Sequence, residues 1–217
     1  MGKITLVCTV HNETGLCNED ELMRILESVG PDVIFEEILP SDFDSYYRDK
    51  SKQTLETRTV GRYLKVRPAR QVPVDEFVIP ESLPRDMGSL FDYVESHSIE
   101  YRALIAERDQ KTHQHGFRYL NSQEFEALSK RSRESFEKTI ALSGSEGLKK
   151  ILSTWNELLR RRENSMLENI HDFCRKSSFT EGVFLVGAGH MSSIVEDIES
   201  RKNTEADIVD WKIWTRI

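Results

Sequence analysis

The stretch KITLVCTV, Lys3 to Val10, is an almost unbroken series of β-forming residues and runs directly into His11. A short apolar run of this kind is typical of a strand that is buried on both faces. A helix is expected next, because Asn18 can cap an amphipathic stretch that stops at Gly30. A second buried strand, Asp32 to Glu37, then completes a strand–helix–strand unit, which favours parallel pairing through a right-handed crossover.

The remaining chain continues this alternation around one long helical stretch. Ser41 to Leu64 has a polar helical pattern, and Gln71 to Val78 predicts a third strand whose limits Pro73 obscures. Apolar residues then recur at helical spacing from about Ser82 to Ser177. The last predicted elements are a strand at Val183–Val186, a helix at Met191–Arg201 and a strand at Ile208–Trp214. The expected fold class is therefore α/β, with a Rossmann-like, mainly parallel sheet in a single domain over residues 1–217. A long helical insertion at about 82–177 is expected to form a cap.

Composition excludes several classes of protein. The 217 residues carry 37 acidic against 30 basic side chains, a net charge of −7, which argues against broad binding to nucleic acid or anionic lipid. The three cysteines include no CxxC pair, so neither a disulfide framework nor a cysteine zinc site is expected. The opening apolar run is too short and polar for a signal peptide, and no later run approaches the ~20 apolar residues of a membrane span. We therefore expect a cytoplasmic protein with no nucleic acid or membrane partner.

Polar residues gather where the predicted strands end. His11 follows the first strand, Glu36 and Glu37 close the second, Asp75 lies near the end of the third and His190 follows a later one. In open α/β sheets, ligands bind outside the carboxyl ends of the strands. Two imidazoles and these carboxylates could hold zinc, manganese or iron, or could act as a general acid and base. Taken singly, each residue also has a structural explanation, such as a loop hydrogen bond, a solvated strand exit or a helix cap.

Gly187-Ala188-Gly189, before His190, resembles the start of a dinucleotide fingerprint. Ser192 stands at the third glycine position, so the pattern is weak evidence for nucleotide binding. We interpret it as a tight turn that brings His190 and backbone N–H groups close to the sheet edge.

These motifs resemble those of the superfamily that contains the TraB/PrgY pheromone-shutdown proteins, the Tiki proteases, the ChaN-type proteins and the erythromycin esterases. Its members share an opening strand that ends in G-x-x-H, a second strand that ends in Glu, an Arg-containing helix and a late G-x-x-H. The matching segments here are Cys8-Thr9-Val10-His11, Glu36-Glu37, Gly187-Ala188-Gly189-His190, and Arg162 to Ile170, which is similar to R-[DEN]-x-x-M-x-x-N-[IV]. Cys8 stands where the family has Gly, and its side chain would narrow the approach to His11.

The resemblance implies a hydrolase in which water attacks an amide or ester bond of a small-molecule or peptide substrate. It implies His11 or Glu36 as the general base, His190 as the proton donor and Arg162 as the partner of the oxyanion. The substrate would contact four further residues: Glu37, Asp75, Gly187 and Gly189. The Tiki-like branch implies a divalent metal (Mn, Zn or Fe) held by His11, Glu36 and His190, whereas the erythromycin esterase-like branch implies metal-free chemistry. The alternative is a non-catalytic module that binds haem or a peptide, or that has a regulatory role.

Overall fold

The computed structural model describes residues 2–76, 83–201 and 208–216. Within these residues the chain forms one five-stranded parallel sheet in the order β3-β2-β4-β1-β5. The strands are β1 (Gly2–Thr9), β2 (Val33–Glu36), β3 (Arg70–Pro73), β4 (Glu181–Gly187) and β5 (Val209–Ile213). The central strands β1, β2 and β4 are buried almost throughout, which explains why they read as continuous apolar runs.

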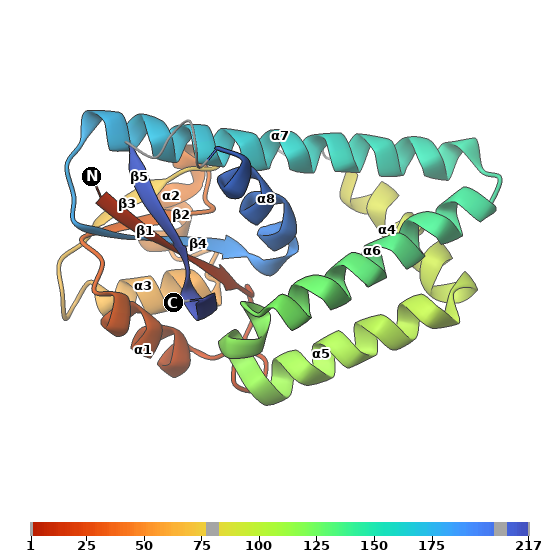
Figure 1. The fold of residues 1–217 in the computed structure, drawn as a ribbon, viewed down its shortest axis with the longest axis horizontal. Coiled ribbons are helices and arrows are strands. Elements are labelled where there is room, and N and C mark those ends of the chain that lie inside the picture. Colours follow the sequence, from red (N-terminus) through yellow and green to blue (C-terminus); the bar gives the residue numbers. More distant parts are fainter. Residues whose placement is uncertain (1, 77–82, 202–207, 217) are drawn as a thin grey trace.

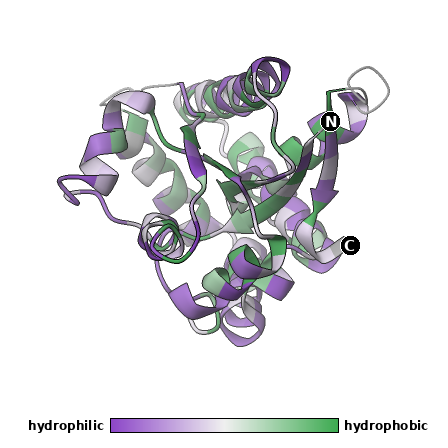
Figure 2. Ribbon diagram, turned by 90° about the vertical axis from the view of Figure 1, so that its left-hand side faces the viewer, coloured by the Kyte–Doolittle hydropathy of each residue, from purple (hydrophilic) through white to green (hydrophobic). Residues whose placement is uncertain are grey.

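Helices cover both faces of this sheet (Figure 1, Figure 2). The helices α1 (Glu19–Val29) and α3 (Leu55–Tyr63) pack together on one face. The C-terminal half of α7 (Glu146–Lys176) and α8 (Met191–Arg201) cover the other. The expected cap of α1 is present, because the side chain of Asn18 accepts from the backbone N–H of Glu21, and Gly30 ends the helix in the left-handed conformation.

The order of the strands reverses between β1 and β4. From β1 the chain runs outward through β2 to β3, whereas from β4 it crosses β1 to reach β5 on the opposite side. The connections therefore leave these two neighbouring strands on opposite faces of the sheet, and a crevice opens beyond their carboxyl ends. His11 follows the end of β1, and His190 follows the end of β4, so both lie at this crevice.

Four helices build the cap: α4 (Leu83–His97), α5 (Ile99–Leu120), α6 (Gln123–Leu142) and the N-terminal half of α7. They pack around a hydrophobic core of their own, separate from the core under the sheet, and its buried members are Leu83, Met87, Leu90, Val94, Tyr101, Phe136 and Ile140. The long helix α7 joins the two parts (Figure 1), and its buried residues begin only at Arg162, where it reaches the sheet.

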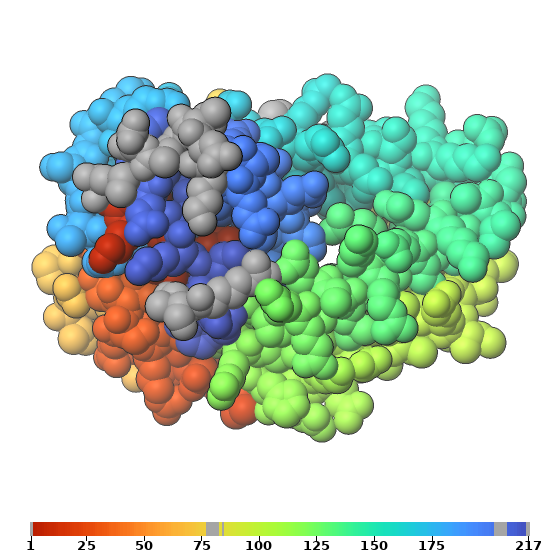
Figure 3. Space-filling model, viewed as in Figure 1, coloured from red at the N-terminus to blue at the C-terminus, as the bar shows by residue number. Residues whose placement is uncertain are grey.

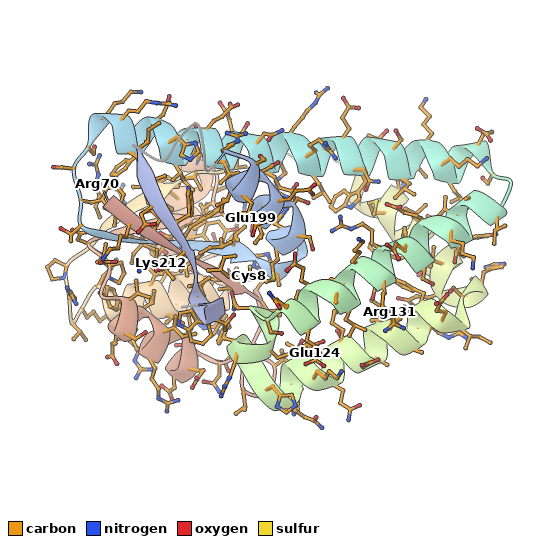
Figure 4. All side chains as sticks on the ribbon, viewed as in Figure 1. Cys8, Arg70, Glu124, Arg131, Glu199 and Lys212 are labelled. Atoms are coloured by element: carbon orange, nitrogen blue, oxygen red, sulfur yellow. The ribbon has the colours of Figure 1, made fainter. Side chains whose placement is uncertain are left out.

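The cap is fastened to the sheet at the turn between α5 and α6. The buried side chain of Asn121 accepts from the backbone N–H of Cys8 at 2.7 Å and donates to the carbonyl of Cys8 at 3.0 Å, so it pairs with β1 as a further strand would. Cys8 lies near the end of β1, beside the start of α6 (Figure 4). The position expected to narrow the approach to His11 is thus fully buried and is tied to the cap.

The α/β class and the helical region are confirmed, but two boundaries differ from the sequence prediction. The third strand covers Arg70–Pro73 and not Gln71–Val78, because the regular pairing with β2 ends with the bond from the Val74 N–H to the Glu36 carbonyl, and the next N–H, that of Asp75, donates to Ile38 in the loop; residues 77 and 78 lie outside the described part. The stretch 41–64 is divided into the short helices η1 (Pro40–Asp42) and α2 (Phe43–Tyr47), a non-helical segment, and α3. The predicted start of the insertion at Ser82 also lies outside the described residues. None of the helices that the structure describes is long and apolar enough to cross a membrane.

Candidate functional site

The two histidines that follow β1 and β4 lie close together. An ideal Cβ atom added to Gly187 would be 3.9 Å from His11 Cε1, 3.9 Å from His190 Cδ2 and only 3.2 Å from Glu37 Oε2. Gly187 is therefore a glycine because the carboxylate of Glu37 approaches its backbone, whose N–H donates to Glu37 Oε2 at 2.8 Å. The expected meeting of His11 and His190 at one edge of the sheet is confirmed.

His11 forms a hydrogen-bonded pair with a glutamate that the motifs did not indicate. Its Nδ1 lies 3.1 Å from Oε1 of Glu56, which belongs to the first turn of α3. The same oxygen accepts from Thr9 Oγ1 at 2.7 Å, and the backbone N–H of Leu55 donates to the His11 carbonyl at 2.8 Å. The hydrogen bond to Glu56 raises the pKa of His11 above its usual value. With Nδ1 donating to the carboxylate, the neutral ring has its lone pair on Nε2.

Within the His11–Glu56 pair, the imidazole of His11 is the more accessible group. Its side chain is 60% exposed, whereas that of Glu56 is 11% exposed. A buried carboxylate thus orients an accessible histidine, which is the arrangement by which enzymes fix the tautomer of a basic imidazole.

His190 is held at both ring nitrogens and is buried. Nδ1 lies 2.7 Å from Oε1 of Glu163, and Nε2 lies 3.2 Å from Oε1 of Glu37. Burial alone would lower the pKa of His190, but the two carboxylates outweigh it and raise the pKa to about 9. His190 is therefore an imidazolium at neutral pH.

Arg162 joins Glu37 to Asp75 in the same buried network. Its Nη2 donates to Glu37 Oε1 at 2.8 Å and to Asp75 Oδ2 at 2.8 Å, and its Nε lies 3.4 Å from Asp75 Oδ1. Burial would raise the pKa of Glu37, but His190, the Gly187 N–H and Arg162 outweigh it and lower the pKa to about 2. Met166, one turn after Arg162, is fully buried, as the helix motif predicted.

Glu36 points to a different set of partners. It accepts from Tyr47 Oη and, at 3.0 Å, from Gln71 Nε2, and it is almost fully buried. Burial raises the pKa of Glu36 to about 7, against the opposing effect of these two donors. This carboxyl group therefore binds its proton more tightly than an exposed glutamate does.

A cleft of about 1410 Å³ lies between the sheet edge and the cap. Its polar end includes His11, Glu37, Arg162, Gly187, Gly189 and His190. Its other end is formed by side chains of the cap helices, among them Phe91, Tyr101, Phe136 and Trp155. Figure 3 shows the hollow between α6 and the α7–α8 side of the molecule. The volume exceeds the ~300–1,000 Å³ that is usual for a small-molecule site.

Not every predicted site residue reaches this cleft. Glu36 lines a smaller cavity behind His11, and Asp75 lines neither of the two cavities because it is buried behind Arg162. Two further site residues, Glu56 and Glu163, were not predicted from the sequence. Glu163 directly follows Arg162 in the helix motif and could have been noticed there, whereas Glu56 meets His11 only through the packing of α3.

The proposed metal ligands do not fit a metal ion in this arrangement. Among residues 2–76, 83–201 and 208–216, no group of three or more His, Cys, Asp or Glu side chains is placed to hold one. Both nitrogens of His190 are bonded to carboxylates, and both oxygens of Glu36 accept from Tyr47 and Gln71. His11, Glu36 and His190 thus do not converge as a ligand set.

Comparison of the chain with models of protein families, with curated proteins and with solved structures finds no match. The site is therefore interpreted from its own geometry.

Proposed function

We propose that the chain is a hydrolase of ester or amide bonds and that His11 is its general base. The observation that carries the proposal is the His11–Glu56 pair at the cleft: the carboxylate engages Nδ1, and Nε2 of the neutral ring can then accept a proton from water. The resemblance to the TraB, Tiki, ChaN and erythromycin esterase superfamily implies a general base at His11 or Glu36, and the pair with Glu56 favours His11.

The reaction follows from this pair. His11 Nε2 takes one proton from a water molecule while the water oxygen bonds to the carbonyl carbon of the substrate. The carbonyl π electrons move to the oxygen and form the oxyanion, and Glu56 stabilises the imidazolium. When the C–O or C–N bond then breaks, the leaving group takes the proton back from Nε2, and the neutral histidine is restored.

Arg162 and His190 have different roles in this scheme. Arg162 lines the cleft, and its Nε and Nη2 bind Asp75 and Glu37, so Nη1 is the nitrogen that can donate to the oxyanion. His190 is protonated and is bonded on both sides, which suits it to hold Glu37 and Glu163 in place and not to act as a base.

The competing function is non-catalytic binding of a ligand such as haem or a peptide. The size of the cleft and the aromatic side chains of the cap support it. This function needs no base, so it predicts ligand binding without turnover, and binding that survives the loss of the His11 imidazole.

A screen of ester and amide substrates with three proteins tests the proposal: the wild type, His11→Ala and His115→Ala. His115 is an exposed histidine of α5 and provides the matched control. The wild type and His115→Ala should hydrolyse the same substrate at similar rates, whereas His11→Ala should be slower by about 10²–10⁴-fold. Equal rates for His11→Ala and His115→Ala, or no turnover of any substrate by the wild type, would remove the hydrolase function.

A further inference from the structure

A small second cavity lies behind His11, at the end of β2 and the first turn of α3. Its volume of about 30 Å³ is enough for one or two water molecules and for no larger ligand. The carboxyl-bearing residues that line it are Glu36, Glu37 and Glu56. His11, Glu37 and Gly187 line both this cavity and the cleft, so the cavity lies directly next to the proposed reaction site.

Glu56 has one oxygen that the surrounding protein does not satisfy. Oε1 accepts from both Thr9 and His11, while Oε2 is buried and has no hydrogen-bond partner among the described residues. The residue as a whole is 8% exposed. A buried carboxylate oxygen without a donor is costly, and native proteins commonly satisfy such a group with an internal water. Oε2 therefore needs a hydrogen-bond donor, and the cavity that Glu56 lines is the place for one.

Glu36 reaches the same cavity from the opposite element, β2. Tyr47 and Gln71 fix its carboxyl group from α2 and β3, but each oxygen retains a lone pair for a further contact. The raised pKa of Glu36 is caused mainly by burial, and the negative charge of Glu56 adds to it, so the two side chains lie within electrostatic reach. One water molecule in a cavity of this size can form a hydrogen bond to each of two carboxyl groups that face it.

We propose that a water molecule bound in this cavity joins the carboxyl groups of Glu36 and Glu56, and that Glu36 is thereby a positioning residue for the Glu56–His11 pair. This inference rests on the proposed function only in giving His11 the role of base. When Glu36 is protonated, its O–H donates to the water, and the water donates to Glu56 Oε2. When Glu36 is ionised, the same water donates one hydrogen to each carboxylate.

The link makes the basicity of His11 depend on Glu36. An ionised Glu36 adds a negative charge close to the pair and favours the imidazolium, whereas a protonated Glu36 draws charge away from Glu56 through the water. The other charged groups that act on His11 are Glu37 and His190, which oppose each other. Glu37 also lines the cavity, but His190, Arg162 and Gly187 bind it and keep it ionised near neutral pH. Tyr46 is the remaining titratable residue of the lining, and its pKa is raised by burial.

The test is an NMR titration of the His11 ring in the intact chain, for the wild type, Glu36→Gln and Glu13→Gln. Glu36→Gln keeps the shape of the side chain and removes its ionisation, and it should lower the pKa of His11 by about 0.5–1 pH unit. The wild-type curve should also be broader than that of Glu36→Gln, because two coupled groups titrate together. Glu13 is exposed and lines the cleft but not the cavity, so Glu13→Gln controls for the loss of any nearby charge. An unchanged His11 titration in folded Glu36→Gln, or an equal change in Glu13→Gln, would overturn the proposal.

A crystal structure of the unchanged protein provides a test that does not depend on the folding of a variant. It should contain a water within hydrogen-bond distance of both Glu56 Oε2 and a Glu36 oxygen; a dry cavity, or an ion in place of the water, contradicts the inference. Neither measurement needs a substrate. A protein that shows the coupled titration but hydrolyses nothing would refute the hydrolase function alone, and active protein with an uncoupled His11 would refute the water link alone.

Discussion

Replacing His190 with Gln should make the stability of the chain depend less on pH. The pKa of His190 rises from 6.5 to about 9 on folding, because Glu163 and Glu37 hold the protonated ring. One pKa unit corresponds to about 1.4 kcal/mol, so protonation of the folded state contributes about 3 kcal/mol to the free energy of unfolding. Because the folded pKa is raised, this contribution is fully present below pH 6.5 and is lost as the pH rises through about 9.

The assay is urea unfolding of the wild type, His190→Gln and the control His115→Gln at several pH values from 6 to 9.5, followed by tryptophan fluorescence. The free energy of unfolding of the wild type should be larger than that of His190→Gln. This difference should be about 3 kcal/mol larger at pH 6 than at pH 9.5. Groups such as Glu36 titrate in both proteins and cancel in the difference. A gap between the two proteins that does not change with pH, or that widens toward pH 9.5, would refute the assignment of His190 as a buried imidazolium.

Two further predictions concern how the cap is attached. Asn121→Ala should lower the free energy of unfolding by about 3 kcal/mol, because it removes the two buried hydrogen bonds between the Asn121 side chain and the Cys8 backbone; urea unfolding measures this, and a loss below about 1 kcal/mol contradicts it. Gly116→Ala should lower the melting temperature, because Gly116 has a φ of +58° and an added Cβ would lie 2.8 Å from the Leu16 backbone oxygen. Its matched control is Gly88→Ala in α4, where an added Cβ meets nothing within 4 Å, and equal melting of the two variants would refute the steric argument.

The sequence predicted those parts of the fold that short-range physics determines. The buried strands appear as apolar runs, and α1 is bounded by a side-chain cap at Asn18 and by a left-handed Gly30. The positions of His11 and His190 followed from the rule that parallel strands present their carboxyl ends at one edge. The end of β3 was predicted less well, because the pairing with β2 stops after the bond from the Val74 N–H to the Glu36 carbonyl, and the Asp75 N–H then donates to Ile38 beyond the end of β2.

The partners of the two histidines could not be predicted in the same way. Glu56 is 45 positions from His11, and Glu163 is 27 positions from His190, so both pairs exist only after α3 and α7 have packed on the sheet. The same packing decides that Glu36 and Glu37, which are adjacent in sequence, have opposite electrostatics. Glu37 meets Arg162 and His190 and remains charged, whereas Glu36 is buried between neutral donors and binds its proton more tightly. β2 ends at Glu36, and Glu37 lies in the loop that follows, where Arg162 and His190 reach it.

If a charged Glu56 makes His11 a base, the kcat of the variant Glu56→Gln must fall, and this measurement tests the proposed function most directly. Glutamine can still accept the Nδ1 hydrogen of His11 but carries no charge, so the imidazolium formed during the reaction loses its stabilising partner. We predict that kcat on the best substrate of the wild type falls by about 10²-fold or more, with the melting temperature nearly unchanged. A kcat within about twofold of the wild type would show that His11 needs no carboxylate partner and would contradict the account.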